Sequence, residues 1–312
     1  MRFLRLPLLL IAALAPLASN SAPVIVGVLL KGHSDFWTAV GQGAEKAGTQ
    51  AGATVIVKAP PAETDVAIQV ALLRALGEQG ISALVIAPTS KEALAGPVAA
   101  LAAKGVKIVV IDSPLAGDVA TTFVGTNQQA AGAAAGRLLA GLVGDADEVA
   151  FLRHNQSGGA TLLRETGALV QLHSVHPNVT IHGDVYASTE PGVEADRSQL
   201  LLTKYPNAKA IFASGTPGTM AMLQVLTAQK PASSVKLIGC GFDLNPAVVA
   251  GLKAGTMAGW IAQLPHDIGA KGVKAALAAV AGQTMPAVIP TEFMVVTKDN
   301  LDDPKVQGLL AL

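Results

Sequence analysis

The chain has 312 residues, of which 51% are hydrophobic and 14% are charged, and its 22 basic residues balance its 22 acidic ones. No basic run, charged tail or interleaved aromatic cluster indicates a nucleic-acid or other polyanion partner. The one cysteine, Cys240, excludes an internal disulfide. Because it ends an apolar run, we expect it to be a small core residue rather than a reactive thiol.

The N-terminal residues have the pattern of an export signal. Two arginines precede an apolar run over residues 6–17, which is too short to span a bilayer as a helix. Small residues at Ser19 and Ser21 predict cleavage after Ser21, and the lack of a cysteine there predicts no lipid anchor. Removal of residues 1–21 leaves 20 basic and 22 acidic residues, a net charge of −2.

Apolar, β-branched runs of strand length recur along the mature chain. The predicted strands are Val24–Leu30, Thr54–Lys58, Ala83–Ala87, Lys107–Ile111, Thr122–Val124, Glu148–Leu152, Thr180–Tyr186, Ala210–Ala213, Lys236–Cys240 and Met257–Ile261. Stretches with helical periodicity lie between them. The predicted helices are Phe36–Ala51, Thr64–Gln79, Lys91–Lys104, Gln128–Val143, Ala160–His176, Gly192–Lys204, Thr216–Ala228, Pro246–Ala254 and Pro265–Ala281.

This alternation predicts an α/β fold with doubly wound parallel sheets, because strands without in-and-out polarity are covered on both faces. About ten strands are too many for one compact domain, so we expect two similar lobes. The two halves also share a strand that ends next to an aspartate, Asp112 in the first and Asp243 in the second. Open parallel sheets bind ligands beyond the carboxyl ends of their strands, which predicts a polar cleft at these ends.

Catalytic motifs are missing from the sequence. No G-x-G-x-x-G follows the first strand, and neither a P-loop nor a G-x-S-x-G nucleophile elbow occurs. The six histidines do not have metal-ligand spacing, and His173 and His176 suit a surface or capping role beside Pro177. We therefore expect a binding protein without cofactor or metal, not an enzyme.

Two segments carry a family resemblance. They are Trp260-Ile261-Ala262-Gln263-Leu264-Pro265-His266-Asp267-Ile268-Gly269-Ala270-Lys271-Gly272-Val273 and Val28-Leu29-Leu30-Lys31-Gly32-His33-Ser34-Asp35-Phe36-Trp37. Both segments resemble periplasmic sugar-binding proteins of the ribose and allose type. The order of the other elements is similar as well. The resemblance implies two lobes joined by three hinge crossings, a type I periplasmic binding protein fold. It also implies a monosaccharide ligand and an inner-membrane ABC permease as partner, with a sensor or chemoreceptor as a further possible partner.

The resemblance carries over to individual positions. Phe36 and Trp37 match the aromatic platform that sandwiches the sugar ring, although both could instead begin an amphipathic helix and pack inward. Asp112 and Asp243 match the carboxylates of the first and second lobes, and a carboxylate can accept hydrogen bonds from vicinal hydroxyls. Because Asn245 before Pro246 is the better helix cap, Asp243 is free to bind.

Four further positions complete the expected site. Arg164 matches an arginine on the second-lobe helix that faces the cleft, and Gln263 matches a side chain beside the hinge. Lys31 could donate to the ligand, as the allose-type branch suggests. The family's asparagine or aspartate after the strand at 210–213 is replaced here, and a hydroxyl of Thr216 or Ser214 could substitute. Ser113 stands where the family often has arginine, which leaves the identity of the sugar open.

We expect residues 23–125 and 264–290 to form the first lobe and residues 126–263 and 291–312 the second, in a soluble, monomeric periplasmic protein. A transcription repressor with the same core would need a DNA-binding headpiece of about 60 residues, and the signal peptide occupies that place. A secreted enzyme is disfavoured by the missing motifs. The same fold binding a polyol, a furanose or an autoinducer-type signal stays open.

Overall fold

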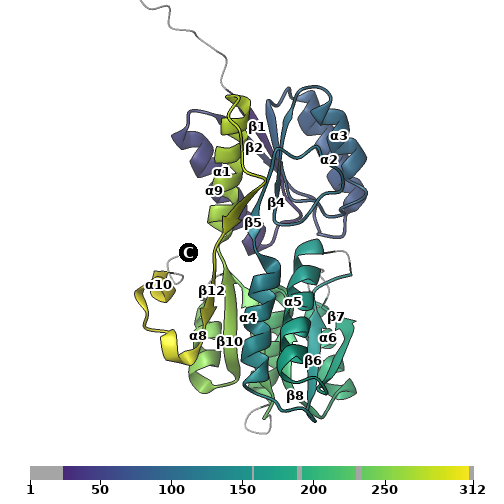
Figure 1. Ribbon diagram of the computed structural model, residues 1–312, viewed down its shortest axis with the longest axis vertical. Helices are drawn as coiled ribbons and strands as arrows, with labels where there is room; N and C mark the ends of the chain where they lie inside the picture. The colour runs from purple at the N-terminus through teal and green to yellow at the C-terminus, as the bar shows by residue number, and fades with distance from the viewer. Residues whose placement is uncertain (1–23, 157, 188–191, 230–233, 243, 309–312) are drawn as a thin grey trace, which may run out of the picture.

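The computed structural model describes residues 24–156, 158–187, 192–229, 234–242 and 244–308. The predicted export signal and Asp243 lie outside these ranges. The described chain forms two α/β lobes stacked along the long axis of the molecule, and the chain passes between them near the middle (Figure 1).

The first lobe is built on a parallel sheet with the strand order β11-β5-β4-β3-β1-β2. The strands are β1 (Ile25–Leu29), β2 (Thr54–Lys58), β3 (Ala83–Ile86), β4 (Lys107–Ile111), β5 (Thr122–Thr126) and β11 (Val288–Thr291). The packing helices are α1 (Asp35–Gln50), α2 (Val66–Glu78), α3 (Ala95–Ala102) and α9 (Pro265–Val280). Helices α1 and α9 cover one face and α2 and α3 the other (Figure 1), and each face buries its own apolar cluster.

The second lobe is built on a sheet with the order β12-β10-β9-β8-β6-β7. Its strands are β6 (Glu148–Arg153), β7 (Thr180–Tyr186), β8 (Ala208–Ala213), β9 (Lys236–Gly241), β10 (Met257–Gln263) and β12 (Phe293–Val296). Its helices are α4 (Gln128–Ala140), α5 (Gly159–Val175), α6 (Glu194–Lys204), α7 (Thr216–Ala228) and α8 (Pro246–Ala254), and a 3₁₀ turn at Lys298–Asn300 and α10 (Pro304–Gln307) follow β12. Two buried clusters again lie on the two faces of the sheet.

The two-lobed α/β fold predicted from the sequence is confirmed, and each of the ten predicted strands is present. The ten predicted strands all pair in parallel within their sheets. Strand β12, which was not predicted, pairs antiparallel with β10. The carboxyl ends of both sheets face each other, and β11 ends at this junction. Strand β12 begins two residues later and therefore runs away from the junction, opposite to β10.

Close packing of α4 against α5 determines how α5 reaches the junction. A Cβ atom on Gly132 would lie 1.9 Å from the carbonyl oxygen of Arg164, and one on Gly167 would lie 2.3 Å from that of Gln129. Only glycine fits where two helix backbones approach this closely. Helix α5 is thereby held against α4 along the turns that carry Arg164.

Within the part of the chain that the structure describes, no helix combines the length and apolar character needed to cross a membrane.

Candidate functional site

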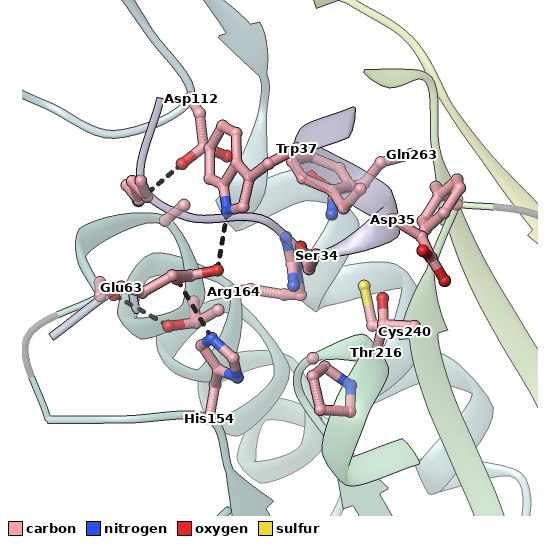
Figure 2. Close-up of a pocket in the computed structure, with 18 of the residues that line it drawn as sticks. Ser34, Asp35, Trp37, Glu63, Asp112, His154, Arg164, Thr216, Cys240 and Gln263 are labelled. Atoms are coloured by element: carbon pink, nitrogen blue, oxygen red, sulfur yellow. Dashed lines mark hydrogen bonds and ion pairs between the residues drawn. The ribbon is translucent and has the colours of Figure 1, made fainter. Parts of the chain in front are cut away.

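A cavity of about 260 Å³ lies where the carboxyl ends of the two sheets face each other. This size is near the lower end of the roughly 300–1,000 Å³ typical of small-molecule sites. Figure 2 shows side chains from both lobes pointing into it. The structure brings together seven of the eight residues predicted for the site, which are Lys31, Phe36, Trp37, Asp112, Arg164, Thr216 and Gln263. The eighth, Asp243, lies outside the described residues.

Asp112 is held in the cavity wall by an unusual backbone and a buried cation. Its φ of 61° lies in the left-handed region, the one such value at a non-glycine position among the residues described here. Strained backbone of this kind clusters at functional sites. The ammonium of Lys31 lies 2.8 Å from Oδ2 of Asp112, and it also donates to Oγ of Ser113, which in turn donates to the same Oδ2 at 2.9 Å. Oδ1 of Asp112 has no hydrogen-bond partner among the residues that the structure describes, which leaves it for a ligand.

The aromatic residues at the start of α1 both reach the cavity. Trp37 is buried and its ring lies at 90° to that of Phe36, with 5.0 Å between the ring centres. Phe36 in turn packs edge-on against Phe242 of the other lobe, at 5.8 Å. The expected aromatic wall is thus present, with apolar faces suited to the C–H side of a sugar ring.

Glu63 and His154 belong to the site, although neither was predicted as a binding residue. Oε1 of Glu63 accepts a hydrogen bond from Nε1 of Trp37 at 2.7 Å, and Oε2 lies 3.4 Å from Nε2 of His154 (Figure 2). Burial alone would raise the pKa of Glu63, but the hydrogen bond and charge of His154, the charge of Lys31 and the Trp37 bond outweigh it and lower the pKa to about 2. The carboxylate is therefore ionised at neutral pH.

Contacts between described residues of the two lobes cross the junction. They include the Glu63–His154 pair, the Phe36–Phe242 ring contact, and a hydrogen bond of 3.2 Å from the backbone N–H of Ala160 to Oγ of Ser113. The Ala160 N–H is one of the free donors at the start of α5. The structure is accordingly a closed arrangement of the two lobes.

Arg164 and Gln263 are joined by a residue that sequence reasoning missed. Gln128 accepts hydrogen bonds from Nε and Nη2 of Arg164, at 3.0 and 2.6 Å, and donates one of 2.8 Å to Oε1 of Gln263. Arg164 also donates to the backbone carbonyl of Ser214. The neighbouring Glu165 pairs with Arg153.

The two hydroxyl candidates after β8 lie differently. Thr216 is the first residue of α7 and lines the cavity. Ser214 is buried behind the cavity, where its Oγ accepts from the backbone N–H of His154 at 3.0 Å and donates to Glu165 at 2.7 Å. Its hydroxyl is therefore committed to the protein, so the alternative of Ser214 as ligand-binding residue was wrong.

The structure confirms the predicted helix cap at Asn245 and the predicted burial of Cys240, and it places Trp260 in the core. Trp260 is completely buried in the core of the second lobe. Asn245 caps α8 by accepting from the N–H of Val248, with Pro246 in the first turn. Cys240 is a free, buried thiol whose pKa burial raises, and it forms part of the cavity wall. Among the residues whose placement is described, no group of histidine, cysteine and acidic side chains could hold a metal ion.

Two parallel-sheet lobes that close on a cavity lined by aromatic, carboxylate, guanidinium and amide groups define a two-lobed solute-binding protein. Residues 26–284 match the model of the periplasmic binding protein domain, so the chain belongs to the periplasmic binding protein family.

Curated relatives extend over most of the chain. The ribose import binding protein of Salmonella typhimurium is 26% identical over 90% of this chain and 92% of its own length. The D-allose-binding periplasmic protein of Escherichia coli is 28% identical over 86% and 89%, respectively.

Solved structures agree with this assignment. A carbohydrate transporter solute-binding protein from Agrobacterium radiobacter, in complex with D-arabinose, is 30% identical, with a TM-score of 0.86 over 93% of this chain and 99% of that chain. An ABC transporter solute-binding protein from Agrobacterium vitis with bound D-fucose is 26% identical, with a TM-score of 0.85 over 92% and 99%.

Proposed function

We propose that the protein is a periplasmic solute-binding protein that closes on a monosaccharide or related polyol and delivers it to an ABC importer. The observation that carries this proposal is the closed cavity between the lobes, where Phe36 and Trp37 face Asp112, Arg164 and Gln263. Its relatives bound to D-arabinose and D-fucose support a monosaccharide of similar size.

The chemistry of the cavity suits a neutral polyhydroxylated ligand. The open oxygen of Asp112 can accept from hydroxyl groups, while the ammonium of Lys31 and the guanidinium of Arg164 can donate to them. Bonds to such charged groups are about twice as strong as neutral ones. The paired charges of Lys31 and Asp112 largely cancel, so a ligand need not be charged. We propose binding without turnover.

The partner in this proposal is an inner-membrane permease that recognises the closed lobes of a monomer. A sensor or chemoreceptor could read the same closed form. Hinge motion would occur where the chain passes between the sheets, near residues 125–127, 263–264 and 290–291. These positions would separate the two lobes at the boundaries predicted from the sequence. Asp243 would supply the second-lobe carboxylate.

The direct test is a ligand panel on purified protein lacking residues 1–21. Thermal shift and calorimetry with pentoses, hexoses, polyols, furanosyl signals, amino acids and peptides would identify the class of ligand, and the emission of Trp37 should respond to binding. Tight binding of an amino acid or peptide, with no response to any carbohydrate, would contradict the proposal.

A further inference from the structure

Gln128 is a buried amide that contacts two of the predicted ligand-binding residues at once. It is the first residue of α4, directly after the chain leaves β5 of the first sheet, and its side chain is almost wholly enclosed. Oε1 accepts two hydrogen bonds from Arg164 and Nε2 donates one to Gln263. Both ends of the amide are therefore used by the protein.

The chemistry of these groups fixes the direction of every bond. A guanidinium has only N–H donors, so the Gln128 atom that faces Arg164 must be the oxygen. Nε2 of Gln128 must then face Gln263, and a donor there requires the oxygen of Gln263 as its partner. Gln263 consequently has its own Nε2 on the other side. That amide donates to no residue the structure describes, and Gln263 lines the cavity.

We infer that Gln128 is a positioning residue that commits Gln263 to present N–H donors to the ligand. This inference rests on the proposed function, because it specifies what the bound sugar must offer at this wall: an acceptor such as the ring oxygen, or a hydroxyl acting as acceptor. All three residues lie on the second sheet or on helices packed against it, so the network is formed before a ligand closes the cleft.

Gln128→Glu tests this directly. A carboxylate still accepts from Arg164, so the buried guanidinium keeps its partner, but it cannot donate to Gln263. Gln263 then turns its Nε2 towards position 128 and exposes its oxygen to the cavity. Gln263→Glu reverses the same polarity from the other side and keeps its bond from Gln128. The matched control is Gln129→Glu, which places the same charge in the same turn of α4 at an exposed position.

D-ribose, D-allose, D-arabinose and D-fucose serve as probes in calorimetry. For each sugar that the wild type binds, Gln128→Glu and Gln263→Glu should each lower affinity about tenfold or more, the loss expected when a polar partner is mismatched. Gln129→Glu should stay within about twofold, and all three should melt close to the wild type. Wild-type affinity in a well-folded Gln128→Glu variant would overturn the inference.

Side-chain amide signals in ¹⁵N-labelled protein give a readout that does not depend on finding the sugar. The signal lost in Gln263→Glu is that of Gln263, and in the sugar-free protein it should shift in Gln128→Glu but not in Gln129→Glu. An unmoved signal would overturn the positioning role of Gln128. If the wild type binds no carbohydrate while the signal shifts as expected, the proposed function fails and the positioning role stands.

Discussion

Nε2 of His154 lies 3.4 Å from Oε2 of Glu63, and this pair joins the loop after β2 in one lobe to the end of β6 in the other. Because a carboxylate only accepts, Nε2 of the imidazole must carry a proton. The other oxygen of Glu63 holds the indole of Trp37. One side chain thus connects closure of the lobes with the placement of the aromatic wall.

The lowered pKa of Glu63 predicts acid sensitivity. Since the pKa falls from 4.5 to about 2 in the folded protein, its stabilising contribution is complete above pH 4.5 and is lost as the pH falls towards 2. The free energy of unfolding should decrease across this window by up to about 1.4 kcal/mol per pH unit from this group. In Glu63→Gln this part of the decrease should disappear. Denaturant titrations at several pH values measure it, with Asp118→Asn as an exposed control; equal slopes in wild type and Glu63→Gln would contradict it.

Removal of either member of the Lys31–Asp112 pair should destabilise the protein and abolish tight binding. Each group is almost fully buried, so Lys31→Met leaves a carboxylate without its cation and should cost about 1.5–3 kcal/mol. The double variant Lys31→Met with Asp112→Asn should recover part of this loss, since no unpaired charge remains. A double-mutant cycle by chemical denaturation measures the coupling; additive losses would show that the pair does not interact.

The glycine contact between α4 and α5 predicts a combined effect on stability and affinity. Gly132→Ala forces a methyl group against the backbone of Arg164, which should cost about 1–3 kcal/mol and displace the guanidinium. Gly96→Ala in α3 is the control, because the described atoms leave open space around its Cβ; it should be neutral or stabilising by about 0.5–1 kcal/mol. Melting curves and sugar titrations measure both effects. Unchanged affinity in Gly132→Ala would mean that Arg164 is not placed by this contact.

Asp243→Ala should weaken sugar binding by about 1.5–3 kcal/mol, the range for hydrogen bonds to charged groups. The apo melting temperature should barely change, since Asn245 already caps α8. Calorimetry and melting of the sugar-free protein measure the two quantities. Loss of stability with residual affinity intact would assign Asp243 to the fold instead of the ligand.

Ligand binding should make the molecule more compact. Asp112 and Arg164 lie on different lobes, and one small ligand reaches both only when the cleft is shut. Small-angle scattering should give a smaller radius of gyration with saturating sugar, a hinge closure of the kind periplasmic binding proteins undergo. Identical radii at independently shown full occupancy would indicate a permanently closed protein.

Much of the fold follows from local sequence. The ten predicted strands are continuous apolar runs, and such runs are informative because both faces of these sheets are covered. Strands β11 and β12 were not predicted from the sequence, because they are short and half-exposed and β11 contains Pro290. Each pairs with the strand that lies beside it where the chain passes for the last time from the first lobe to the second. No local sequence pattern encodes that position.

Site residues could be predicted where they matched a family motif. They could not be predicted where their role depends on contacts with residues that are distant in the sequence. Glu63 lies in the loop after β2, a strand end at which ligands of open parallel sheets bind. His154 directly follows β6, but its partner Glu63 lies 91 residues away in the sequence. Gln128 lies two residues after the end of β5, and its role depends on Arg164 and Gln263, 36 and 135 residues away.

The left-handed backbone at Asp112 limits which substitutions at this position can change the sugar specificity of the protein. Asparagine and glycine tolerate that conformation best, yet either would strand the buried ammonium of Lys31. We therefore expect substitutions at Asp112 only together with substitutions at Lys31. Relatives that lack the aspartate should also lack the lysine. New sugar preferences are then more accessible through the residues around the pair than through the pair itself.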